Sequence, residues 1–102
     1  MTPRNKPAVY LLSLAYDDLK RLPGNVRRQM IVAIDGLEIN SRPPKSKILE
    51  IKDETREIRR LRLGKWRIIY AVIDEQPIIL GVRRRPPYDY QDIQRLLEDV
   101  DQ

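Results

Sequence analysis

The residues best suited to chemistry in this sequence are arginines and tyrosines near the ends of strand-like segments. Arg60 and Arg62 alternate with Leu61 and Leu63, so in a strand the two guanidinium groups project from one face. A guanidinium can hold phosphate oxygens through two parallel hydrogen bonds, and an aromatic ring can stack on a base. The spacing therefore predicts a basic surface that holds a phosphodiester.

Further basic residues follow this pair along the chain. Arg67 lies in the next strand-like segment, and antiparallel pairing would place it beside the first two. A solvated charged face is the commoner explanation for any one arginine, whereas the cluster as a whole favours phosphate binding. The candidate catalytic residues are Arg60, Arg62, Arg67, Arg83 and Tyr88, and further contacts to nucleic acid are expected from Arg59, Lys65, Arg84 and Arg85.

The charge distribution supports a polyanionic partner. Lysine and arginine number 20 against 15 acidic residues, which gives a formal net charge of +5. Residues 56–85 hold nine of the basic residues and three acidic ones, whereas residues 86–102 hold one arginine and five acidic residues. The chain thus has a basic middle and an acidic end segment.

Two absences from the sequence exclude whole classes of chemistry. The chain has no Cys and no His, so it can build no disulfide, thiolate nucleophile, Ser-His-Asp triad or His- or Cys-based zinc site. A purely carboxylate metal site stays formally open, but no regular metal-ligand spacing supports one, and we expect neither a metal nor another cofactor. With no apolar run near 18 residues, the sequence predicts a soluble cytoplasmic protein without a membrane segment.

The elements that must position these side chains follow from hydrophobic periodicity and turn residues. Residues 8–14 are predicted to form a central strand, and residues 17–22 and 25–40 two helices that are separated by Pro23 and Gly24. Strands are predicted at 58–63, 66–73 and 77–82, a further short strand is uncertain at 48–51, and a last helix follows Asp89. Trp66 and Tyr90 are expected to pack into the core.

This order, β-α-α-β-β-β-α, predicts a small α+β fold. The two helices form an N-terminal hairpin, and the last three strands form an antiparallel meander. At 102 residues the whole chain, 1–102, is expected to be a single domain.

Four segments resemble the RelE/ParE toxin superfamily. The two most telling read R-L-R-L-G-K-W-R-I-I-Y at residues 60–70 and G-V-R-R-R-P-P-Y at 81–88. The segments D-L-K-R-L-P at 18–23 and S-R-P at 41–43 also match, and the likeness spans roughly residues 9–90 in the predicted order of elements. The resemblance implies a RelE-like fold, of the type seen in microbial ribonucleases.

For RelE-type members the resemblance implies an mRNA interferase, an endoribonuclease that cuts mRNA in the ribosomal A site without a metal. The ribose 2′-hydroxyl would attack the adjacent phosphate and displace the 5′-oxygen of the next nucleotide, so the products would carry a 2′,3′-cyclic phosphate and a 5′-hydroxyl. Arg60 and Arg67 would neutralise the phosphate, Arg83 would stabilise the transition state, and Tyr88 would orient or activate the 2′-hydroxyl. Arginine is a poor general base, so the proton acceptor stays open, as does the choice between Tyr88 and Tyr90.

The resemblance also implies partners and leaves alternatives. A cognate antitoxin would bind the toxin in a hetero-oligomer and neutralise it, while mRNA and the ribosome would be its targets. The main alternative is a ParE-like member that inhibits DNA gyrase by binding, because a shared fold does not fix function. A catalytically inactive ribosome-binding member is the third possibility.

Changing Arg60 and Arg62 together to Ala is expected to abolish growth inhibition while leaving the fold intact, because two phosphate-binding guanidinium groups are lost. Growth of cells that express the variant, with circular dichroism of the purified protein, measures both properties. Full toxicity of a folded double variant would contradict the site assignment.

Overall fold

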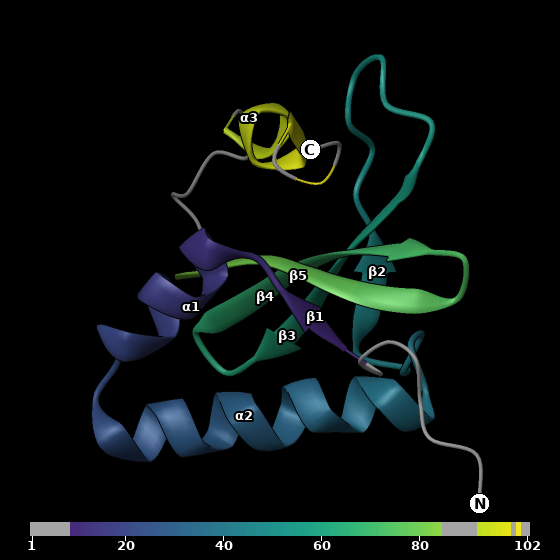
Figure 1. The fold of residues 1–102 in the computed structure, drawn as a ribbon. Coiled ribbons are helices and arrows are strands. Elements are labelled where there is room, and N and C mark those ends of the chain that lie inside the picture. Colours follow the sequence, from purple (N-terminus) through teal and green to yellow (C-terminus); the bar gives the residue numbers. More distant parts are fainter. Residues whose placement is uncertain (1–8, 85–91, 99, 101–102) are drawn as a thin grey trace, which may run out of the picture.

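The computed structural model describes residues 9–84, 92–98 and 100, which form three helices and five strands (Figure 1). The first elements are β1 (Tyr10–Leu11), α1 (Ser13–Lys20) and α2 (Gly24–Ile39). The remaining elements are β2 (Ser46–Ile48), β3 (Glu57–Leu63), β4 (Trp66–Ile73), β5 (Gln76–Arg84) and α3 (Ile93–Glu98). None of the helices in the described ranges has the length and apolar character needed to cross a membrane.

The five strands form one sheet in the order β1-β5-β4-β3-β2. β1 runs parallel to β5, and the other neighbours are antiparallel. The helical hairpin of α1 and α2 covers one face, and α3 lies over the other (Figure 1). The predicted α+β class, the helical hairpin and the antiparallel meander are therefore confirmed.

The first strand differs from its predicted form. It is two residues long and lies at the edge of the sheet, and the chain is already helical from Ser13. The apolar residues Ala15, Leu19 and Leu22 recur at intervals of four and three residues, and all three are buried in the core cluster between the helical hairpin and the sheet. Helical burial of this stripe outweighs the strand preference of the preceding segment.

A fourth strand follows the helical hairpin, where the predicted order counted three. β2 begins at Ser46, two residues before the uncertain strand at 48–51, and pairs antiparallel with β3. Ser46 is buried and its hydroxyl donates to the Pro43 carbonyl at 2.8 Å. Ile48 is exposed, so this strand is fixed by pairing and by the Ser46 contact rather than by apolar burial.

Two tight turns set the register of the meander. Gly64 and Lys65 connect β3 to β4, with Gly64 at φ +58°, and Leu63 pairs with Trp66. Asp74 and Glu75 connect β4 to β5 with φ of 51° and 62°. Positive φ at both Asp74 and Glu75, and at the first central residue of the other turn, Gly64, is typical of two-residue hairpin turns whose twist matches that of the flanking strands.

The face beneath the helical hairpin contains a buried tyrosine that ties the sheet to the loop after α2. The Tyr70 ring is fully buried among Met30, Ile34 and Leu37 of α2 in the same core cluster. Its hydroxyl donates to the Ser41 carbonyl at 2.7 Å. This hydrogen bond fixes the point at which the chain leaves α2.

Changing Tyr70 to Phe is expected to lower the free energy of unfolding by about 1–2 kcal/mol, because the Ser41 carbonyl loses a donor at a buried position. Urea denaturation of the purified protein measures this difference. Tyr16 to Phe is the matched control, since Tyr16 is more than half exposed. Equal stability of both variants would contradict the role assigned to the Tyr70 hydroxyl.

Candidate nucleic-acid interface

Three predicted arginines form a row across adjacent strands. Arg62 of β3 pairs with Arg67 of β4, and Arg67 pairs with Arg83 of β5. Directly paired residues project from the same face of a sheet, so we call Arg62, Arg67 and Arg83 the arginine row. Arg60 lies two residues before Arg62 on β3 and shares this face, which is the one that α3 covers in part. The juxtaposition expected from the sequence is therefore present.

Arg60 and Arg62 supply the cations of this face that are available to a ligand. Arg62 is exposed and Arg60 is half-buried. Within the described residues, neither guanidinium makes a hydrogen bond or an ion pair. A phosphate could therefore bind both without displacing a carboxylate of the described chain.

Arg67 is held by the backbone of its own turn. It is 6% exposed, and its Nη1 donates to the carbonyl oxygens of Gly64 and Trp66, each at 2.8 Å. These contacts stabilise the turn between β3 and β4. Arg67 thus contributes fixed positive charge on the strand next to Arg62.

Arg83 is bound by two carboxylates from different parts of the chain. It forms an ion pair with Asp18 of α1, and its Nη2 donates to Asp92, just before α3, at 3.0 Å. Asp18 Oδ2 also accepts the Val82 backbone N–H at 2.9 Å. Sequence reasoning missed both carboxylates, although Asp18 opens the D-L-K-R-L-P segment that carried part of the resemblance.

Two of the remaining predicted nucleic-acid contacts, Arg84 and Lys65, lie within two residues of a member of the arginine row in the sequence. Arg84 lies over the Trp66 ring, 5.7 Å from its centroid, while Trp66 packs partly buried against the core as expected. Lys65 is exposed in the turn beside Arg67. Arg85 and Tyr88, together with the alternative tyrosine Tyr90, lie outside the described residues.

Arg59 lies on the opposite face of the sheet from Arg60 and Arg62. Its Nε donates to Ser46 Oγ at 3.1 Å, and its Nη1 donates to Glu57 at 2.9 Å. Strand alternation places it on the same side as Leu61, beneath the helical hairpin. The structure therefore separates Arg59 from the arginine row and engages it in internal contacts.

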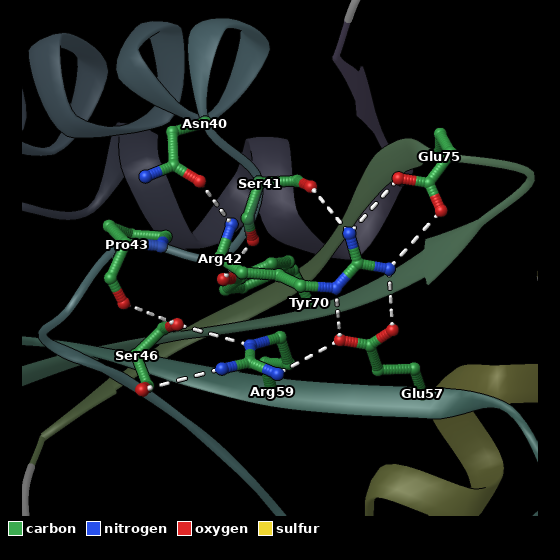
Figure 2. A network of polar contacts seen from close by, with 9 residues as sticks. All are labelled: Asn40, Ser41, Arg42, Pro43, Ser46, Glu57, Arg59, Tyr70 and Glu75. Atoms are coloured by element: carbon green, nitrogen blue, oxygen red, sulfur yellow. Dashed lines mark hydrogen bonds and ion pairs between the residues drawn. The ribbon is translucent and has the colours of Figure 1, made fainter.

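The contacts of Arg59 belong to a larger polar network, shown in Figure 2. Arg42 donates to both carboxylate oxygens of Glu57, at 2.9 and 2.8 Å, and to Glu75 at 3.0 Å. The hydrogen bonds from Arg42 hold the pKa of Glu57 and of Glu75 below the usual value for glutamate. The network joins the loop after α2 to β3 and to the turn between β4 and β5.

No group of His, Cys, Asp and Glu side chains among the residues that the structure describes could hold a metal ion.

Comparisons with known proteins identify a family from the sequence and a shared fold from solved structures. The model of a family described as "ParE toxin of type II toxin-antitoxin system, parDE" matches residues 9–85. No curated protein matches the chain. In the RelE–RelB complex from Pyrococcus horikoshii OT3, a chain 27% identical to this one superposes with a TM-score of 0.67, covering 78% of this chain and 96% of that one.

Two further structures share the fold at lower identity. The toxin–antitoxin complex RelBE2 from Mycobacterium tuberculosis contains a chain at 24% identity and TM-score 0.64, covering 76% of this chain and 95% of that one. The isolated RelE toxin from E. coli matches at 17% identity and TM-score 0.61, covering 90% of this chain and 96% of its own.

Changing Glu57 to Gln is expected to destabilise the protein near neutral pH, and the difference from the unchanged protein should shrink in acid. The folded-state pKa of Glu57 is lowered, so its carboxylate contributes stability above the unfolded pKa, about 4.5, and loses that contribution as pH falls through the folded pKa. Thermal unfolding between pH 7 and pH 3 measures the gap.

Glu50 to Gln is the control for this series, because Glu50 is exposed. A stability gap for the Glu57 variant that stays constant from pH 7 to pH 3 would contradict a contribution from its ionised carboxylate.

Proposed function

Because the chain belongs to the ParE toxin family of type II toxin–antitoxin systems, within the RelE/ParE superfamily, we propose that it is a toxin that acts on RNA. Its activity is that of a ribosome-dependent, metal-free endoribonuclease that cleaves mRNA in the ribosomal A site. The observation that carries this proposal is the clustering of Arg60, Arg62, Arg67 and Arg83 on one sheet face.

The arrangement suits a phosphodiester better than a general acidic surface. Neighbouring strands lie about 4.8 Å apart, so the directly paired positions of the arginine row bring three arginines close together on adjacent strands. Arg60 and Arg62 would bind the phosphate oxygens, and Arg67 and Arg83 would add positive charge where the transition state becomes more negative. Tyr88, or Tyr90, would act on the 2′-hydroxyl.

Dependence on the ribosome follows from what arginines can do. The reaction needs a base that accepts the 2′-hydroxyl proton and an acid that protonates the leaving 5′-oxygen. Arginine stays protonated, so it stabilises charge but does not readily accept a proton. A substrate held in line for attack by the ribosome would lower the barrier through orientation, which this site does not need to supply itself.

One observation from the comparisons and one from the structure favour a second function, which is inhibition of DNA gyrase by binding. The matching family model is that of ParE toxins, and Arg67 and Arg83 both make internal contacts. Inhibition of DNA gyrase by binding would need surface charge from Arg60 and Arg62 but no catalytic set.

The cognate antitoxin would cover apolar surface that the toxin leaves exposed. Val32 and Ile39 of α2 are 71% and 90% exposed, and an apolar hollow of about 370 Å³ runs from Gly36 to Pro43 and Leu61. Burying this surface would stabilise the complex, which we propose is a hetero-oligomer of toxin and antitoxin. The matched chain from Pyrococcus horikoshii is itself part of a RelE–RelB complex.

Purified toxin is expected to cut mRNA on programmed ribosomes and to leave gyrase supercoiling unchanged. Changing Arg60 and Arg62 to Ala should slow cleavage about 100-fold or more, because two charge-stabilising groups are lost. Primer extension on the mRNA and a supercoiling assay, run on the same preparations, measure both activities.

Changing Arg21 and Arg28 to Ala is the matched control, because it removes the same charge from exposed positions on the helical hairpin. Gyrase inhibition without mRNA cleavage would replace the proposal by the ParE-like function. Ribosome binding without cleavage would replace it by the inactive ribosome-binding member.

A further inference from the structure

We propose that Asp18 positions Arg83 for the substrate phosphate, while Asp92 occupies the phosphate-binding side of the same guanidinium until substrate arrives. The inference deepens the proposed function and rests on it for the identity of the substrate. It assigns opposite effects on activity to two carboxylates that contact one arginine.

Asp18 is held in place by the edge of the sheet. β1 pairs with β5 at Tyr10 and Leu11 and ends there, so the outer edge of β5 beyond Ile79 faces α1. Asp18 Oδ2 accepts a hydrogen bond from the backbone N–H of Val82 on that edge and another from the guanidinium of Arg83. The Asp18 side chain is 18% exposed. One carboxylate oxygen thus fixes Arg83 relative to its own strand.

Gly81 provides the space for this contact. A Cβ at position 81 would lie 2.8 Å from Arg83 Nη1 and 3.1 Å from Asp18 Oδ2. The guanidinium therefore folds back across Gly81 to reach Asp18. Both clashing atoms are ends of side chains, so an alanine here would move the Arg83 guanidinium rather than break the strand. Gly81 and Asp18 thus both contribute to the contact between Asp18 and Arg83.

Asp92 contacts the other terminal nitrogen of Arg83 and is more exposed than Asp18. It accepts from Nη2 at 3.0 Å, its side chain is 33% exposed, and it precedes the six-residue helix α3. Two carboxylates on one guanidinium give this group of three side chains an excess of negative charge, which opposes phosphate binding. Departure of one carboxylate removes that excess and leaves Nη2 of Arg83 to donate to a phosphate oxygen. Asp92 is the one we expect to leave, because it is the more exposed of the two.

A purely structural role for both carboxylates makes a different prediction. In that case each ion pair would tie a helix to β5, and loss of either would reduce stability and activity together. The positioning role predicts opposite signs: loss of Asp18 impairs the site, and loss of Asp92 improves substrate binding.

The first measurement is single-turnover cleavage of mRNA on programmed ribosomes by full-length D18N, D92N and G81A. D18N and G81A should lower the rate constant at saturation about 10-fold to 100-fold, because Arg83 is misplaced. D92N should lower the half-saturating concentration about 3-fold to 10-fold, because the phosphate no longer competes with a carboxylate. Assays run well below each variant's unfolding midpoint, taken from a thermal scan, separate these effects from loss of fold.

Matched controls remove the same charge nearby. D17N changes the neighbouring aspartate of α1, which makes an exposed contact with Lys20, and E98Q changes an exposed carboxylate of α3. Both should stay within about twofold of the unchanged protein, since general electrostatic attraction is screened by salt. Changes in the controls equal to those of D18N and D92N would overturn the inference.

A second measurement does not depend on cleavage. Nitrogen NMR of the Arg83 guanidinium should show faster rotation in D18N and G81A, and an RNA trinucleotide blocked by 2′-O-methyl groups should bind D92N more tightly. If the unchanged protein cleaves nothing but these shifts occur, the proposed function fails and the inference stands. If D18N and D92N change affinity in the same direction, the inference is overturned.

Discussion

Repulsion among the positive charges that meet on β3, β4 and β5 is the constraint on which the rest of the structure depends. Like charges directly opposite one another on adjacent strands destabilise a sheet. The chain meets this cost differently at each position of the arginine row. Arg67 is neutralised in part by carbonyl dipoles of its turn, Arg83 by two carboxylates, and Arg62 by solvent. Positive charge is thereby concentrated toward β3, where a ligand can approach.

On the opposite face of the sheet, the arginines form ion pairs with glutamates of the protein. There Arg42 and Arg59 share the carboxylate of Glu57, and Glu75 adds a second carboxylate to Arg42 (Figure 2). These charges are balanced within the protein and serve to hold a loop and a turn. One sheet therefore carries a balanced polar network on the side of the helical hairpin and an excess of positive charge on the side of α3.

Local patterns in the sequence predicted the elements and the arginine cluster well, because strand alternation and helical periodicity depend on near neighbours. Arg60, Arg62, Arg67 and Arg83 share one face as expected. The same alternation places Arg59 on the other face, a consequence that grouping by charge overlooked. The contact between Arg83 and Asp18 could not be predicted, since Asp18 lies 65 residues away in sequence and reaches Arg83 only after α1 docks on β5. β1 was predicted too long because tertiary burial of α1 overrides local strand preference.

The two-residue turns of the meander have a consequence for the order of folding. From Glu57 to Arg84 each strand pairs with the next one in sequence, so little loop entropy is lost when these strands associate. Docking of α1, by contrast, must bring together residues far apart in the chain. We therefore expect the meander to assemble early, with its arginines side by side and still uncompensated, and the acidic groups of α1 and α3 to arrive later. The last contacts to form would then be those that set the charge of the finished site.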